Sequence, residues 1–261
     1  MKILFVGDVV GRTGRNALSI RLGRLVDRHE VDLVVVNGEN AAAGFGLTLD
    51  IVREFFDLGV DVITSGNHIW DKKEIFEHLD REPRLLRPAN YPPGLPGRGS
   101  GVYETSAGIP VGIINLEGRV FMNNLECPFR CADALIDDLR RQTPIILVDF
   151  HAEATSEKVA MGHYLDGRVS AVVGTHTHVQ TADEQILSGG TAYLTDAGMT
   201  GSLDAVIGIR KELAIERFLT QLPVRFEVAK KDPVLCGVLF TIDEDTGRAQ
   251  AVQRIFEKIE Q

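Results

Sequence analysis

The segment Ile3-Leu4-Phe5-Val6-Gly7-Asp8 is the first of five short apolar runs that end in residues able to bind a metal or carry a proton. The other four are Leu33–Asn40, Val62–His68, Ile145–His151 and Val172–His178. Short runs rich in Val and Ile and bounded by Gly are typical of strands buried on both faces of a sheet. In an open α/β sheet, ligands bind just beyond the carboxyl ends of the strands. The five runs therefore predict a single site at that edge.

Helical patterns separate the first three runs. Apolar residues have helical spacing from Arg12 to about His29, and a second helix is predicted from about Leu49 to Leu58, with Thr48 as its N-cap. A third helix is predicted to start at Asp71, because Asp71 and Glu74 have the spacing of a capping box. Strands that alternate with helices in this way form parallel sheets with right-handed crossovers.

Two β-hairpins are predicted in the rest of the chain. One joins Gly101–Thr105 to Pro110–Leu116, and the other joins Leu235–Ile242 to Arg248–Ile255. Parallel runs and antiparallel hairpins in one chain indicate mixed sheets that pack face to face with helices outside. No repeat or linker interrupts the pattern. We therefore expect an α/β fold, a four-layer α/β/β/α sandwich of two mixed sheets, formed by a single domain over residues 1–261.

Composition narrows the class of protein. The chain has 28 Lys and Arg residues against 37 Asp and Glu, which makes its formal net charge −9. This charge argues against binding to long nucleic acid, which depends on neutralising many phosphates. No apolar stretch approaches the roughly 20 residues that span a bilayer, and Cys127, Cys131 and Cys236 lack paired zinc spacing. We expect a cytoplasmic protein with reduced thiols and no membrane partner, and we leave open whether it forms a homo-oligomer.

The candidate metal ligands that follow the five runs are Asp8, Glu39, Asn40, Asn67, His151, His176 and His178. Taken singly, several could have purely structural roles, since Asp8 could cap a helix and the two asparagines could supply turn hydrogen bonds. The group is more informative, because His176 and His178 would point the same way from an extended chain. Carboxylate, imidazole and amide oxygen together suit Mn, Fe, Zn or Co.

Glu39 has the chemistry to bridge two metal ions, because one carboxylate can give an oxygen to each of two metals roughly 3.5–4 Å apart. Asp8 and Glu39 are the two carboxylates of the set, so a pair of divalent ions would keep a net positive charge. That charge suits a phosphate, and the predicted partner is a small phosphorylated substrate.

These motifs resemble, in order and approximate spacing, those of the calcineurin-like metallophosphoesterases from residue 2 to about residue 200. The matching positions are Asp8, Gly38-Glu39-Asn40, Gly66-Asn67-His68, His151 and Gly174-Thr175-His176-Thr177-His178. Two departures narrow the resemblance: Asp8-Val9-Val10 lacks the histidine of the usual D-x-H, and Gly38-Glu39-Asn40-Ala41 replaces the usual GDxxDRG. Together with Thr195–Gly201, these departures resemble the YmdB-like bacterial branch.

The resemblance implies a metallo-dependent phosphatase-like fold and a phosphodiesterase that acts on 2′,3′-cyclic and, more weakly, 3′,5′-cyclic nucleotides. It implies two metal ions per chain, Fe or Mn with Zn or Co as alternatives, which activate a hydroxide for attack on phosphorus. In that branch the first ion would be held by Asp8, Glu39, Asn40 and His178. The second would be held by Glu39, Asn67, His151 and His176. His68 would be the general acid that protonates the leaving oxygen.

Residues near the ligands have less definite assignments. His68 could instead only orient the substrate, and Asp71 could steady His68, although helix capping is the expectation for Asp71. Asp149 and Asp196 are candidates to hydrogen-bond a metal-binding histidine. His163 is expected to pack within its helix or to support the site from behind.

Two other functions fit the same residues. A phosphomonoesterase or 5′-nucleotidase could use the same centre, because the segments expected to select the substrate, Arg119–Cys131 and Ala197–Ile209, carry no recognisable motif. A nucleotide-binding regulatory protein with slow catalysis is the other alternative. The complete ligand set favours an enzyme, since a pure binding protein has no need of a hydroxide-generating metal pair and an acid.

Overall fold

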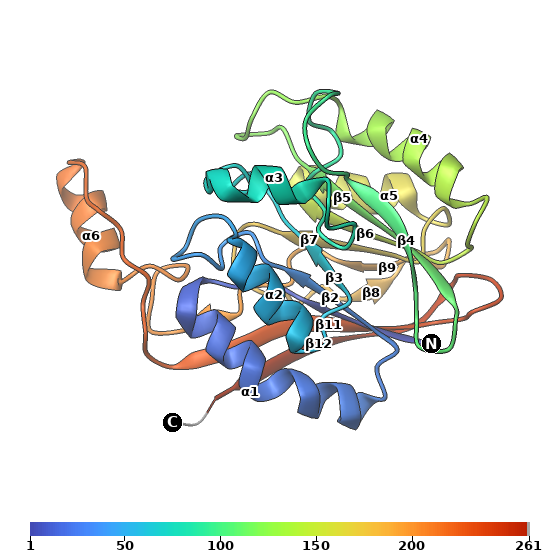
Figure 1. Cartoon of the computed structure of the whole chain (residues 1–261), viewed down its shortest axis with the longest axis horizontal. Coiled ribbons are helices and arrows are strands. Elements are labelled where there is room, and N and C mark those ends of the chain that lie inside the picture. Colours follow the sequence, from blue (N-terminus) through green and yellow to red (C-terminus); the bar gives the residue numbers. More distant parts are fainter. Residues whose placement is uncertain (260–261) are drawn as a thin grey trace.

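The computed structural model describes residues 1–259. Two six-stranded sheets lie face to face, and helices lie on both outer faces (Figure 1). The predicted α/β/β/α sandwich of two mixed sheets is therefore confirmed.

The first sheet has the strand order β10-β11-β1-β2-β3, and β12 also pairs with β11. Its strands are β1 (Lys2–Val6), β2 (Leu33–Asn37), β3 (Val62–Thr64), β10 (Gly201–Ser202), β11 (Pro233–Ile242) and β12 (Ala249–Lys258). The second sheet has the order β4-β5-β6-β7-β9-β8. Its strands are β4 (Ser100–Glu104), β5 (Pro110–Glu117), β6 (Ile146–His151), β7 (Ala171–Thr175), β8 (Gln185–Ile186) and β9 (Ala192–Leu194). Both predicted hairpins are present, as β4–β5 and β11–β12.

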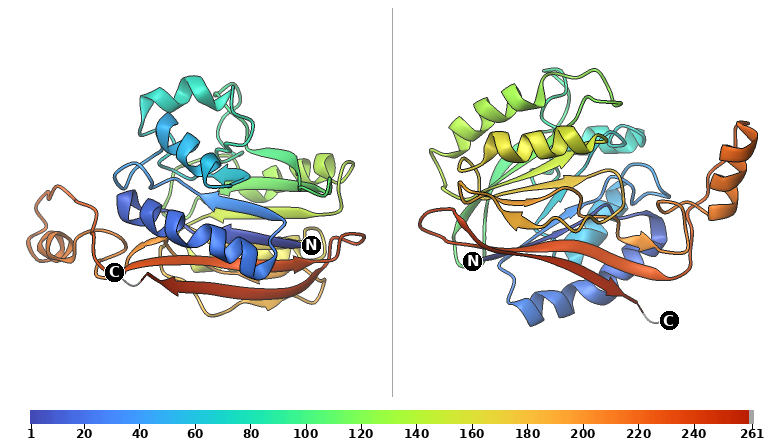
Figure 2. Two further views of the ribbon diagram at one scale, coloured as in Figure 1. Left: turned by 60° about the horizontal axis from the view of Figure 1, so that its bottom comes forward. Right: turned by 180° about the vertical axis from the view of Figure 1, so that it is seen from behind.

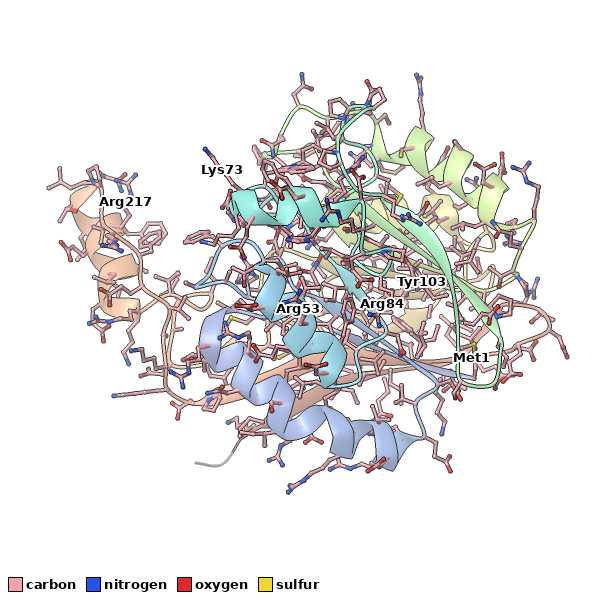
Figure 3. All side chains as sticks on the ribbon, viewed as in Figure 1. Met1, Arg53, Lys73, Arg84, Tyr103 and Arg217 are labelled. Atoms are coloured by element: carbon pink, nitrogen blue, oxygen red, sulfur yellow. The ribbon has the colours of Figure 1, made fainter. Side chains whose placement is uncertain are left out.

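Helices cover the two outer faces separately. The first sheet is covered by α1 (Gly11–His29), α2 (Leu49–Asp57), the short 3-10 helix η1 (Lys73–Ile75) and α3 (Phe76–Leu79), and the second by α4 (Pro128–Leu139) and α5 (Thr155–Leu165). The remaining helix, α6 (Lys211–Thr220), projects away from the sandwich (Figures 1 and 2). Arg217 on this helix accordingly stands apart from the rest of the side chains in Figure 3.

The apolar runs form strands that are buried on both faces, as predicted. In β1, Phe5 faces the second sheet, and its neighbour Leu4 packs with the helices. In β2, Val35 likewise faces the second sheet, and Val34 packs with the helices. Successive side chains of a strand point to opposite faces, so a continuous apolar run fills both layers of the core.

Parallel pairing brings the carboxyl ends of the predicted strands to one edge. β1, β2 and β3 pair in parallel within the first sheet, and β5, β6 and β7 do so within the second. The loops after β1, β2 and β3 therefore meet the ends of β6 and β7 at one end of the sandwich.

The helix after β2 forms as predicted, but the next one does not. Thr48 caps α2, since its Oγ1 accepts a hydrogen bond from the backbone N of Ile51 at 3.4 Å. The predicted capping box at Asp71 is wrong: η1 starts at Lys73, and its N-cap Lys72 makes no side-chain cap. The carboxylate of Asp71 is instead hydrogen-bonded to His68.

Cys127 and Cys131 are partly buried, Cys236 is buried, and none of the three is in a disulfide. None of the helices within residues 1–259 combines the length and the apolar character that crossing a membrane requires.

Candidate metal centre

Five of the seven predicted ligands form two overlapping groups at the common strand edge. Glu39, His151 and His176 make one group, and Asp8, Glu39 and His178 make the other. In each group the ligand atoms lie within 4.8 Å of one another. Glu39 belongs to both, which is the arrangement that a bridging carboxylate requires.

The first group is completed by the amide of Asn67. The Nε2 atom of His151 lies 3.0 Å from Oε1 of Glu39, 3.1 Å from Oδ1 of Asn67 and 3.0 Å from Nδ1 of His176. Glu39 and His151 are fully buried. Four potential ligand atoms from four different strand ends thus converge on a small buried volume.

The second group is completed by the amide of Asn40. The Nε2 atom of His178 lies 3.2 Å from Oδ1 of Asn40. Asp8 is buried, and its Oδ1 atom has no hydrogen-bond partner. A buried carboxylate oxygen without a partner is costly unless a cation compensates its charge. The residues of both groups therefore fit a pair of metal ions in donor chemistry as well as in arrangement.

A hydrogen-bond chain orients His151. Its Nδ1 lies 2.9 Å from Oγ1 of Thr175, and that hydroxyl donates to Oδ1 of Asp149 at 2.7 Å. Because the single hydroxyl proton goes to Asp149, Thr175 accepts from Nδ1–H of His151, so in the neutral ring Nε2 is the nitrogen that can bind a cation. The expectation that Asp149 itself bonds a histidine is corrected, because the hydroxyl of Thr175 lies between the two side chains.

The two histidines after β7 do not follow an extended chain, so the argument from strand spacing is wrong for them. β7 ends at Thr175, and His176 and His178 both have positive φ, 98° and 65°. The turn directs them to different groups, His176 toward His151 and His178 toward Asn40. Backbone strain of this kind occurs where surrounding structure holds a functional residue in place.

The turn between these histidines is held by a buried ion pair. Oδ2 of Asp196 accepts from Nζ of Lys158 at 2.6 Å, from Oγ1 of Thr177 at 2.6 Å and from the backbone N of Thr177 at 3.1 Å. The prediction that Asp196 bonds a metal-binding histidine is therefore wrong, because it binds the residue between the two histidines. Sequence reasoning missed Lys158, because a lysine is ordinarily expected to be exposed.

A backbone hydrogen bond fixes the orientation of the His178 ring. Its Nδ1 lies 2.9 Å from the backbone carbonyl oxygen of Ile207, so Nδ1–H donates and Nε2 faces Asn40. Ile207 has a φ of 45°, which is strained for a β-branched residue. The loop that carries Ile207 therefore supports a predicted ligand directly.

His68 lies at the mouth of the site, outside both ligand groups of the described residues. Its Nδ1 is 2.9 Å from Oδ2 of Asp71, and its ring meets the ring of Phe45 edge-on at 5.0 Å between centroids. The ring is partly exposed. His163, by contrast, is exposed on α5 and does not pack behind the site as expected.

The charges of the site are strongly coupled. Burial disfavours the charged form of Glu39, but the positive charge and hydrogen bond of His151 outweigh burial and lower the pKa of Glu39 to about 2. Burial likewise lowers the pKa of His151, and Glu39 and Asp8 reverse this and raise it to about 9. Burial and repulsion by His151 lower the pKa of His176 to about 3. Burial raises the pKa of Asp8.

A cavity of about 430 Å³ opens over the ligand groups. One part of its lining consists of predicted site residues, namely Glu39, Asn40, His68, His176 and His178. Residues that sequence reasoning missed complete it, chiefly Phe45, Glu153 and Phe226. Of the two segments expected to select substrate, 197–209 reaches this cavity through Ile207 and Ile209, and 119–131 supplies none of the lining residues in the described chain.

Comparison with known proteins finds similarity over nearly the whole length of the chain. The chain is 52% identical over 255 residues to a protein of Bacillus subtilis named 2′,3′-cyclic-nucleotide 2′-phosphodiesterase, covering 98% of this chain and 96% of the relative. A solved structure of a hypothetical protein from Thermus thermophilus is similar, with a TM-score of 0.93, 42% identity and coverage of 99% of each chain. A solved structure described as a novel phosphatase from Mycoplasma pneumoniae also has a TM-score of 0.93, with 37% identity and coverage of 99% of this chain and 93% of that one. The family model of YmdB-like proteins matches residues 4–255, and the chain belongs to that family.

Proposed function

We propose that this chain is a phosphoric-ester hydrolase of the phosphodiesterase type, which uses two metal ions to hydrolyse 2′,3′-cyclic nucleotides. The observation that carries the proposal is the pair of ligand groups that share Glu39. The relative from B. subtilis, named for this reaction, supports the substrate class. The phosphatase structure from M. pneumoniae supports phosphoric-ester chemistry.

The proposed ligand sets follow the two groups. Asp8, Glu39, Asn40 and His178 would hold one ion, and Glu39, Asn67, His151 and His176 would hold the other. Nitrogen and oxygen donors without thiolate suit Fe or Mn, with Zn or Co also compatible. When bound, such a pair supplies Lewis acidity and lowers the pKa of a water molecule.

The protein residues contribute orientation and a proton. Nδ1 of His68 is held by Asp71, so the proposed acid is its Nε2 atom, on a ring that lines the cavity. In this reaction the oxygen of a water molecule would bond to phosphorus as the bond between phosphorus and O2′ breaks. O2′ would take the proton of His68, and the product would be a nucleoside 3′-phosphate. Opening the cyclic phosphate releases no second organic product, so a small cavity is sufficient.

The test is a substrate screen with protein reconstituted with Mn or Fe. Turnover of 2′,3′-cyclic AMP is expected to exceed that of 3′,5′-cyclic AMP and of 5′-AMP, with 3′-AMP as the product seen by chromatography. Faster turnover of 5′-AMP would favour the nucleotidase alternative. A metal-loaded protein that hydrolyses none of the three would overturn the proposal.

A further inference from the structure

Two chemically different sets of residues line the cavity over the ligand groups. One set consists of the carboxylate, amide and imidazole groups described above. The other set includes the side chains of Phe45, Ile207 and Phe226, which we call the apolar wall. These three side chains are 37%, 51% and 41% exposed, so they face open space and not the protein core. A phosphate needs no apolar surface, which leaves the wall without a role in the chemistry at phosphorus.

Phe45 is held in the wall by its loop. Gly44 and Gly46 on either side have φ values of 96° and 75°, a conformation that glycine adopts without strain. The ring of Phe45 meets His68 edge-on, with an interplanar angle of 70°. The apolar wall is therefore in direct contact with the proposed acid, His68, through Phe45.

Phe226 is anchored although it follows the projecting helix α6. The chain returns to the body at Val228, which pairs with Ile209 in an isolated antiparallel bridge. Val228 packs closely against Gly11 and Gly44, where an added Cβ would lie 2.9 and 3.0 Å from its methyl groups. Phe226 thus lies two residues before Val228, a position that these contacts fix.

Ile207 joins the wall to the ligands. Its side chain lines the cavity, and its carbonyl oxygen accepts the hydrogen bond from Nδ1 of His178. A planar group that rests on the wall would consequently lie next to the ligand groups, through Ile207, and next to His68, through Phe45. This is the arrangement that a nucleoside cyclic phosphate requires, with the base on one side of the ribose and the phosphate on the other.

We propose that the apolar wall of Phe45, Ile207 and Phe226 is the nucleobase subsite, so that the natural substrate is a nucleotide and not a simple cyclic phosphate. The inference rests on the proposed function. Bases stack on aromatic side chains whatever their hydrogen-bonding edge, because every base has a π-face. The three wall side chains carry no hydrogen-bonding groups, so the subsite is expected to accept all four bases. Adenine and guanine should bind more tightly than cytosine and uracil, because their rings are larger.

The test compares a nucleotide with a substrate that lacks the base. In Phe226→Ala, kcat/KM for 2′,3′-cyclic AMP should fall about 5- to 150-fold, the usual loss of one stacking partner. The value for 1-O-methylribose 2′,3′-cyclic phosphate should stay within about twofold of the unmodified protein. Phe226→Trp should restore the value for the nucleotide, because it restores the ring. Phe218→Ala is the matched control, since Phe218 is 73% exposed on α6 and lines no part of this cavity.

Binding of adenosine, measured by calorimetry, tests the wall independently of catalysis. The unmodified protein should bind adenosine, and Phe226→Ala should bind it about 5- to 150-fold more weakly. Equal losses on both cyclic phosphates, or equal efficiency of the unmodified protein on both, would overturn the base subsite while leaving the phosphodiesterase proposal intact. Adenosine binding that Phe226→Ala weakens, in a protein that hydrolyses no cyclic phosphate, would keep the subsite and overturn the proposed function.

Discussion

The Nδ1 atom of His68 lies 2.9 Å from the Oδ2 atom of Asp71, three residues further along the chain. This contact replaces the helix cap that the spacing of Asp71 and Glu74 predicts. It directs one ring nitrogen of His68 to a carboxylate and leaves the other for the substrate. The contact thus fixes which nitrogen of His68 faces the cavity, and the position of His68 outside both ligand groups of the described residues favours an acid role over a ligand role.

Replacing His68 by Ala should keep both metals and reduce turnover of 2′,3′-cyclic AMP by roughly 10²–10⁴, the usual worth of a positioned acid. Asp71→Asn should reduce turnover in the same direction but less. Both losses should shrink for bis(p-nitrophenyl) phosphate, whose leaving group needs no proton. Glu77→Gln, a similar charge change on the exposed surface of α3, should have no effect. Losses of equal size on the two substrates, or loss of metal from His68→Ala, would return His68 to an orienting or ligating role.

Replacing Glu39 by Gln should cost more activity than replacing Asn40 by Ala, because Glu39 belongs to both ligand groups and Asn40 completes one. Elemental analysis after reconstitution should show two metal equivalents per chain in the unmodified protein and fewer than one in Glu39→Gln. Asn40→Ala should retain at least one equivalent. The bridging assignment fails if Glu39→Gln keeps two equivalents and near-normal turnover.

Metal uptake by the metal-free protein should release about one proton from His151 at pH 7.5, because a metal binds only the neutral imidazole. The pKa of His151 is raised to about 9, so this residue is protonated at pH 7.5 before metal binds. Glu39, with a pKa of about 2, and His176, with a pKa of about 3, are already deprotonated and release none. Metal affinity should therefore increase with pH up to about 9. Calorimetry in buffers of different ionisation enthalpy checks this, and a heat independent of buffer would contradict it.

Replacing Gly66 by Ala should displace ligands without unfolding the protein. An added Cβ at Gly66 would overlap Oε2 of Glu39 and Nε2 of His151. We expect a folded protein with less than one metal equivalent. Gly23→Ala is the control, because an added Cβ at this exposed position of α1 meets nothing within 4 Å. That change should leave metal content unaltered and raise the free energy of unfolding by about 0.5–1 kcal/mol. A Gly66→Ala protein with full metal content would show that the ligands can move aside.

Much of the fold could be predicted from local patterns. Short Val- and Ile-rich runs identify strands such as β1 and β7, because a strand buried on both faces needs an uninterrupted apolar sequence. Parallel pairing then brings the ends of these strands to one edge, so residues as distant in the chain as Asp8 and His178 could be predicted to meet. The assignment of each ligand to an ion stays a prediction.

Other features depend on contacts between distant segments, which no local pattern encodes. The chain after β7 turns through positive φ at His176 and His178 because the buried Lys158–Asp196 pair holds the residue between them. Asp71 turns to His68 in place of a helix end, and Phe226 reaches the cavity because Val228 fits against two glycines far away in the sequence. Residue types and strand periodicity identify the chemistry of the centre, since both are local properties. The direction of each side chain and the shape of the cavity are decided by tertiary packing, because only packing determines which distant groups become neighbours.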